Sequence, residues 1–194
     1  PPAAAPAKPA APPAPPRQPV RRAPQEAHRE DLLADLFLRA PQVRARAGRD
    51  EGLGFLLDLA LEKVRCEAGS ALLASGDGLL SFAVARGPKA AELLRLAPRI
   101  PMGVGIVGFC AQESVALAVS DAEGDARHHR AVSEAVKHPA RSLVCAPIAR
   151  GGRVFGALEL VNKVGGGFDE ADLAVLSYLA HQAAEFLAAR DAAE

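Results

Sequence analysis

Two pairs of apolar segments, each joined by a short glycine-containing turn, constrain the fold of this chain more than any other feature. The first pair covers residues 70–74 and 79–85, joined by the sequence Ser-Gly-Asp-Gly, and the second covers 142–148 and 153–161, joined through Gly-Gly. Apolar segments separated by residues that favour tight turns are typical of β-hairpins. The sequence therefore predicts a mainly antiparallel sheet.

Apolar residues at helical spacing predict helices before and after these hairpins. A first helix is expected over 30–46, where Pro41 would end or bend it, and a second begins near Asp50. A final helix is expected over 169–189, with Asp169 as its N-cap. The stripes of the second and final helices have members three or four residues apart: Leu53, Leu57, Leu61 and Val64, and then Leu173, Leu176, Ala180, Ala183 and Leu187.

Shorter elements are expected between the hairpins. The sequence predicts helices over 88–96, 106–112 and 130–137 and a strand over 115–119, while Pro147 places its own strand at an edge or a bulge. The order is then helix, hairpin, helices, strand, helix, hairpin and helix. This order predicts an α+β fold, a central antiparallel sheet with helices packed on it, and excludes a doubly wound parallel sheet.

Composition excludes several classes of function. The formal net charge is zero, so no overall field attracts nucleic acid or an anionic membrane. There is no Trp and one Tyr, so aromatic platforms for stacking bases are scarce. No apolar run approaches the length of a membrane-spanning helix. The three cysteines are odd in number and widely spaced, which indicates a reducing compartment and a cytoplasmic location.

The N-terminal part differs from the rest of the chain. Proline and alanine dominate residues 1–27, a composition that predicts a disordered, extended linker. Pro13 and Pro16 form a PxxP, so a docking peptide is the alternative. We expect residues 28–48 to form a connecting helix and 49–191 the folded domain. Because the chain begins with Pro-Pro and not with Met, we expect it to be part of a longer protein.

Several segments together resemble the GAF domain family. They are Ile-Pro-Met-Gly-Val-Gly-Ile-Val-Gly at 100–108, Val-Ser-Asp at 119–121, Ser-Leu-Val-Cys-Ala-Pro-Ile at 142–148, and Gly-Ala-Leu-Glu-Leu-Val-Asn-Lys at 156–163, followed by Phe168. No single segment is decisive, but their order and spacing are specific. The resemblance implies a GAF/PAS-like α+β fold and a bacterial sensory or regulatory domain.

A partial likeness to phosphodiesterase GAF domains concerns Asn162, Lys163, Phe168 and Asp172; the Glu that follows this Asp in that pattern is replaced by Leu173. A Lys at a strand end can pair with an Asp in the first turn of the next helix. We therefore interpret these four residues as a structural motif, which supports the fold and says little about cyclic nucleotides.

The resemblance also implies where a small ligand would bind, between one face of the sheet and a cover of helices and loops. Residues expected at such a site are Ser81, Ala83, Ile106, Val107, Cys110, Asp121, His128, His129 and Val132. Neighbouring strand residues face opposite sides, so Phe82 and the pair Ser81 and Ala83 cannot all face the ligand. The alternative is that these side chains fill the space themselves. The sequence does not identify a cofactor.

Catalysis and metal binding are not expected. Asp125, His128, His129 and His138 are the only cluster that suggests a metal, and their spacing matches no zinc signature. The glycines at 103, 105 and 108 formally match a dinucleotide-binding pattern but do not follow a strand of a βαβ unit. No Ser/His/Asp set, P-loop or acid pair is evident.

One enzymatic alternative remains. Cys110 lies in a segment that resembles the one carrying a catalytic Cys in free methionine sulfoxide reductases, which share the GAF fold, but here it is displaced. Three structural thiols, Cys66, Cys110 and Cys145, are the simpler interpretation. The leading hypothesis is a non-enzymatic sensory domain that forms a homodimer through its terminal helices, about 30–64 and 169–189, and controls a signalling partner. A GAF fold without ligand that serves as a protein-interaction platform is the alternative.

Overall fold

The computed structural model describes residues 24–193, and side chains from Asp31 onward. These residues form a six-stranded antiparallel sheet with strand order β3-β2-β1-β6-β5-β4, which confirms the α+β fold. Most of the predicted linker, residues 1–23, lies outside the described part of the chain. The strands are β1 (Cys66–Ala74), β2 (Leu79–Arg86), β3 (Arg99–Pro101), β4 (Leu117–Val119), β5 (Leu143–Arg150) and β6 (Arg153–Lys163).

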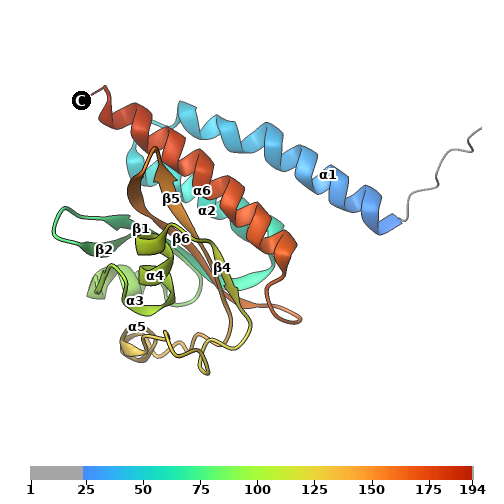
Figure 1. Ribbon diagram of the computed structural model, residues 1–194. Helices are drawn as coiled ribbons and strands as arrows, with labels where there is room; N and C mark the ends of the chain where they lie inside the picture. The colour runs from blue at the N-terminus through green and yellow to red at the C-terminus, as the bar shows by residue number, and fades with distance from the viewer. Residues whose placement is uncertain (1–23, 194) are drawn as a thin grey trace, which may run out of the picture.

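Helices cover both faces of this sheet (Figure 1). One face packs against α2 and α6, with α1 and the 3-10 helix η1 beyond them, and the other carries α3, α4 and α5. No helix between residues 24 and 193 combines the length and the apolar character needed to cross a bilayer. The helices are α1 (Pro24–Arg39), η1 (Ala40–Ala45), α2 (Arg49–Lys63), α3 (Ala90–Leu96), α4 (Gly105–Glu113), α5 (Ala131–Ala135) and α6 (Glu170–Asp191).

The sheet separates two apolar cores. The larger core lies between β1, β5 and β6 and the helices α2 and α6, and includes Leu53, Leu57, Leu158 and Leu176, all fully buried. The smaller core lies between the opposite face and α4, and includes Ile106 and Cys110. Apolar side chains point to both faces of β6, which is one of the two central strands of the sheet, with β1.

Element boundaries differ from the prediction in instructive ways. The helix expected over 30–46 is α1 followed by η1, because Pro41 falls at the start of η1 and interrupts the regular helix. The helix expected over 130–137 shortens to α5, and β3 was not predicted because it has only three residues. Pro147 lies on β5 beyond the last residue paired with β4, so its missing N–H costs no bond on that side.

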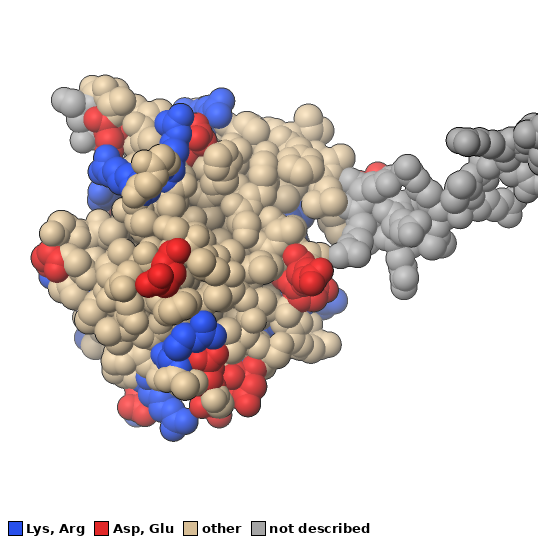
Figure 2. All heavy atoms as spheres, in the orientation of Figure 1, with Lys and Arg blue, Asp and Glu red and all other residues tan. Residues whose placement is uncertain are grey.

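The surface is largely uncharged in one view. Figure 2 shows separate groups of acidic and basic side chains, one of them near the middle of this face, whereas much of the surface over α1 and α6 carries none. Large apolar side chains on α1 are among the exposed ones: Leu33, Phe37 and Leu38, the last with 75% of its surface accessible. Phe37 packs edge-on against Tyr178 of α6, with ring centroids 4.7 Å apart.

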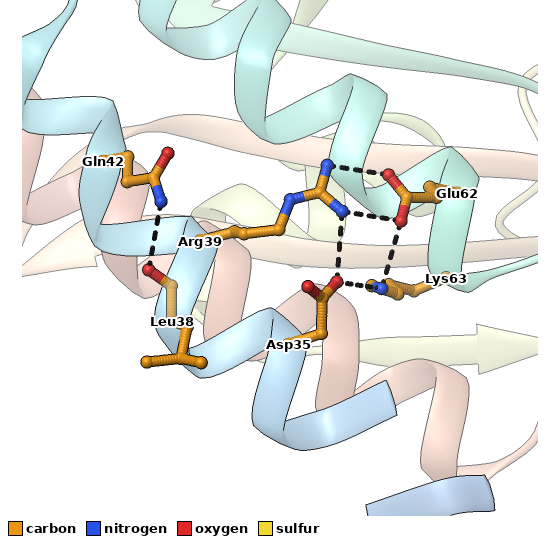
Figure 3. A network of polar contacts seen from close by, with 6 residues as sticks. All are labelled: Asp35, Leu38, Arg39, Gln42, Glu62 and Lys63. Carbon is orange, nitrogen blue, oxygen red and sulfur yellow. Dashed lines mark hydrogen bonds and ion pairs between the residues drawn. The ribbon is translucent and has the colours of Figure 1, made fainter. Parts of the chain in front are cut away.

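Ion pairs fix α1 to the C-terminal end of α2 (Figure 3). The Arg39 guanidinium donates to both carboxylate oxygens of Glu62, at 2.7 and 2.8 Å, and to Asp35 at 3.1 Å. The Lys63 ammonium, which is almost fully buried, contacts Asp35 and Glu62. A planar Arg bonded to both oxygens of a carboxylate fixes orientation as well as distance, so the network sets the angle at which α1 leaves the domain.

We expect Gly156→Ala to unfold or severely destabilise the domain. Gly156 has φ of +154°, and a Cβ there would lie 1.9 Å from the carbonyl oxygen of Leu72 on β1. A loss of at least about 3 kcal/mol in the free energy of unfolding is expected, because backbone atoms of two central strands would have to separate. Urea denaturation followed by circular dichroism measures it.

Gly151→Ala is the matched control, because Gly151 has φ of +57° and open space around it. A side chain at position 151 would meet no neighbouring atoms and would be disfavoured only by the left-handed backbone conformation. We therefore expect a loss of about 1 kcal/mol in the free energy of unfolding. Equal losses for the two variants would contradict the proposed role of the close approach between β1 and β6.

Candidate functional site

A cavity of about 120 Å³ lies between the sheet and the cover formed by α3, α4 and α5. Its floor is formed by β1, β2 and β6, and its walls by the first turn of α4 and by α5 with the loop before it. Most of the lining is apolar. The apolar side chains include Phe82, Leu93, Ile100, Ile106, Val107, Val132, Val136, Leu143 and Val161.

A buried carboxyl group on the floor interrupts this apolar lining. Glu159 on β6 lies directly across from Ser70 on β1, and the Ser70 hydroxyl donates a 3.0 Å hydrogen bond to Glu159 Oε2. Both residues line the cavity, and both are buried. Burial raises the pKa of Glu159 to about 7, although the hydrogen bond from Ser70 favours the ionised form and lowers it in part.

Five of the nine residues expected at a ligand site line this cavity: Ile106, Val107, His128, His129 and Val132. Phe82 also lines it, so its neighbours Ser81 and Ala83 point to the opposite side of β2, as the alternation of strand side chains requires. Cys110 lies under α4 in the smaller core. Asp121 is exposed and accepts a 3.1 Å hydrogen bond from the Gly124 amide within its own loop. Ligand binding by these residues stays a prediction.

Sequence reasoning missed Glu159 and Ser70. The available signal was a single charged residue within the apolar segment Gly-Ala-Leu-Glu-Leu-Val at 156–161, in a strand with apolar neighbours on both sides. A charge in such a strand is rarely buried unless it has a partner or a function. The partner could not be identified from the sequence because Ser70 is 89 residues away.

Basic side chains at the rim of the cavity are largely committed to other partners. Arg86 donates to Asp58 at 2.6 and 3.1 Å, and Lys89 donates to Glu92 at 3.0 Å. His138 lies 3.6 Å from Glu67. His128 is half-buried and His129 exposed at the mouth, so these two imidazoles are the groups best placed to meet an incoming ligand. The described residues contain no group of three or more His, Cys, Asp or Glu side chains arranged to hold a metal ion.

The cysteines are free thiols and lie away from the open cavity. Cys110 and Cys145 are fully buried side by side, and a hydrogen bond between them together with burial raises the pKa of Cys145 well above its usual range. Burial also raises the pKa of the half-buried Cys66 to about 11. A thiol with a raised pKa is a poor nucleophile at neutral pH, because the thiolate is the reactive form.

The four residues of the structural motif connect the end of β6 to its surroundings. The Lys163 ammonium lies 2.5 Å from Asp172 Oδ1 and 5.9 Å from the centre of the buried Phe168 ring. The other Asp172 oxygen accepts from the backbone N–H of Asp169, which caps α6 in return. This is the strand-to-helix pairing that the sequence predicted.

Asn162 completes the motif in a left-handed conformation, with φ of +60°. Its side-chain oxygen accepts from the Arg141 amide at 2.8 Å, and its nitrogen donates to Glu67 at 2.7 Å and to the Pro139 carbonyl at 3.0 Å. The side chain thus joins β6, the start of β1 and the segment before β5. None of these four side chains lines the cavity.

The raised pKa of Glu159 gives a prediction for stability against pH. Its ordinary pKa is 4.5 and its pKa in the folded protein is about 7. Between these values the folded state binds the proton more tightly than the unfolded state, so stability falls as pH rises from about 4.5 to about 7. Glu159→Gln carries no charge at any pH, so we expect it to remove this fall and to be about 1–3 kcal/mol more stable than the wild type at pH 8.

Urea unfolding at pH 5 and pH 8 measures this difference. The quantity that matters is the change in wild-type stability between the two pH values minus the same change in the variant, since all other titrating groups cancel. Parallel profiles for the two proteins would show that the carboxyl group is ionised at little cost in the folded protein.

Solved structures share this architecture. The GAF domain of a phosphoenolpyruvate-protein phosphotransferase from Coxiella burnetii superposes with a TM-score of 0.74 at 18% identity, over 84% of this chain and 96% of that one. A segment of a methyl-accepting chemotaxis protein superposes with a TM-score of 0.68 at 18% identity, over 80% and 98% of the two chains. Free methionine-R-sulfoxide reductase from Neisseria meningitidis, solved with its substrate, gives 0.68 at 22% identity, over 88% and 95%.

Identities this low show a common fold and leave the function open. No curated protein sequence matches the chain significantly. The sequence model of the GAF domain, however, matches residues 47–188, which is most of the chain. The resemblance seen in the sequence is therefore confirmed, and this chain belongs to the GAF domain family.

Proposed function

We propose that this chain is a non-enzymatic sensory or regulatory domain of a bacterial, cytoplasmic signalling protein, in which a small ligand bound in the cavity, or dimerisation, controls an attached domain or a partner. The observation that carries the proposal is the mainly apolar cavity with a buried carboxyl group on its floor. Mainly apolar cavities that contain a small number of polar groups in fixed positions are typical of small-molecule binding sites.

The cover of the cavity is suited to respond to a ligand. It is built from α3 and α5, helices of seven and five residues without side-chain N-caps, and from the loop that carries His128 and His129. Helices this short gain little stability from their own hydrogen bonds. A ligand that contacts both the sheet and this cover would add contacts that hold the cover in place, which is the differential stabilisation that a sensor requires.

The terminal helices provide a route by which the domain would act on a neighbouring domain or partner. Most apolar side chains of α6 are buried between β5 and α2, whereas α1 presents Leu33, Phe37 and Leu38 to solvent. A second copy that packs its α1 against these residues would bury them in a parallel homodimer with two-fold symmetry. The ion pairs of Arg39 and Lys63 keep α1 in register with the domain, so that a change in the domain would alter the helix pair.

The same exposed residues support the alternative of a protein-interaction platform, in which no ligand binds. Apolar groups clustered on a helix face suit a partner surface as well as a second copy. The two alternatives differ in one respect: only the sensor requires a ligand in the cavity.

The enzymatic alternative has one observation in its favour, the structural likeness to a free methionine-R-sulfoxide reductase. The chemistry of the thiols opposes it. Cys110 and Cys145 are fully buried, and Cys66 has a pKa of about 11. Thiol-dependent turnover abolished by Cys110→Ser would support the enzyme over the sensor.

A thermal-shift screen separates sensor from platform. Cyclic nucleotides, haem, amino acids, amines and metal ions are each added to the full chain. A true ligand at 100-fold over its Kd is expected to add about 2.7 kcal/mol to the free energy of unfolding, because it binds only the folded state. Ile106→Trp would fill the cavity and serves as the control, since a specific hit disappears in it. No stabilisation by any class would favour the platform.

Sedimentation velocity at micromolar to high micromolar concentration tests the homodimer. We expect the wild type to be dimeric and Leu33→Glu/Leu38→Glu to shift toward monomer, because each Glu would place a charge in the apolar contact. Val115→Glu, a change at an exposed apolar position outside α1, should leave the dimer intact. A wild type that stays monomeric at high micromolar concentration would contradict dimerisation through α1.

A further inference from the structure

Only one of the two oxygens of the carboxyl group on the cavity floor accepts a hydrogen bond from the described side chains. Ser70 donates to Glu159 Oε2, and residues 31–193 make no other hydrogen bond to the Glu159 side chain. The second oxygen, Oε1, is not sealed off, because Glu159 forms part of the cavity wall. A buried carboxylate oxygen without a hydrogen-bond donor costs free energy, because the hydration that it loses on burial is not replaced. A ligand that supplies a donor would recover part of that cost.

No fixed cation of the described chain supplies that donor. Arg86 and Lys89 line the rim, but they bond Asp58 and Glu92. On the neighbouring strand β5, Cys145 lies directly across from Glu159, and its raised pKa keeps this thiol neutral at ordinary pH. The buried Cys110 of α4 lies beside it. His128, His129 and His138 line the cavity from the loop before α5 and the segment after it.

We propose that the cavity binds a small organic ammonium ion, whose N–H group donates to Glu159 Oε1 while its apolar part lies against Phe82, Ile106 and Val107. This inference rests on the proposed function, since it names the ligand class of that cavity. A cavity of about 120 Å³ is slightly smaller than one that holds benzene, so the apolar part is about the size of a five-membered ring.

The choice of a cation over a neutral acceptor follows from the direction of the hydrogen bonds. Ser70 uses its proton on Oε2, which favours the ionised carboxyl, and an ionised carboxyl is an acceptor only. A charged N–H donor forms a shorter and stronger bond to it than a neutral donor does, most of all where water is excluded. A ligand that offers only an acceptor would instead need the protonated acid.

These two cases predict opposite dependence on pH. Because the pKa of Glu159 is about 7, the ionised fraction rises about tenfold between pH 6 and pH 8. The affinity for an ammonium ion should rise by the same factor, whereas the affinity for an acceptor that needs the protonated acid should fall. Three histidines also line the cavity, so Glu159→Gln is needed to assign the effect to the carboxyl group.

The experiment uses cyclopentylamine, which is cationic throughout this range, and cyclopentanol, its neutral counterpart with the same number of heavy atoms. Binding to the full chain is followed by NMR chemical-shift titration at pH 6 and pH 8. We expect the amine to bind at least tenfold more tightly than the alcohol at pH 8, and to weaken about tenfold at pH 6. In Glu159→Gln, the preference for the amine and most of its pH dependence should be lost.

Glu185→Gln is the matched control, because Glu185 lies on α6 across the sheet and pairs with Arg150. It should bind the amine as the wild type does. Equal binding of amine and alcohol, or an amine preference that survives Glu159→Gln, would overturn the ammonium proposal and leave the cavity as a ligand site. Absence of binding by both probes at 50 mM, together with no hit in the wider thermal-shift screen, would overturn the ligand site itself.

Discussion

The pairing of β6 with both β1 and β5 is the constraint on which the rest of this structure depends. The backbone of Gly156 approaches Leu72 so closely that no side chain fits between them, which fixes the register of β1 against β6. That register places Ser70 across from Glu159. At the end of the same strand, Asn162 and Lys163 join the strand to the segment before β5 and to α6. One strand thus positions the floor of the cavity and closes the fold around it.

Glu159 lowers the stability of the folded domain at a position that the proposed ligand site requires. A Leu at this place would bury apolar surface, whereas the carboxyl group loses its hydration and keeps one hydrogen bond. Its cost is greatest above pH 7, where it must be ionised. Buried ionisable groups with shifted pKa values gather at functional sites, because that is where a protein gains from tolerating them. The polar side chains at the end of β6, Asn162 and Lys163, instead have hydrogen-bond partners on neighbouring segments.

Local patterns predicted much of the fold and less of the site. The two hairpins, the break at Pro41 and the pairing of Lys163 with Asp172 all depend on residues close in sequence, whose spacing carries the information. The side of β2 that faces the cavity was left open, because this strand is partly buried on both faces and its alternation gives no clear signal. The role of Glu159 depends on Ser70 and on a cover contributed by distant helices, and such contacts are set by tertiary packing.

The arrangement of contacts indicates how the cavity would be linked to α1. Gly69 of β1 lines the cavity on one face of the sheet. On the opposite face, the Leu57 side chain of α2 occupies space that a side chain at position 69 would need. Five and six residues further along α2, Glu62 and Lys63 pair with Arg39 and Asp35 of α1. A shift of β1 that accompanies ligand binding would therefore act on α2 first, and α2 would move α1 with it because their ion pairs fix the angle between them. Such coupling requires that α2 has two arrangements, and that the ligand binds more tightly to one of them than to the other. The contact of α2 with β1 at Gly69 is where the two arrangements would differ.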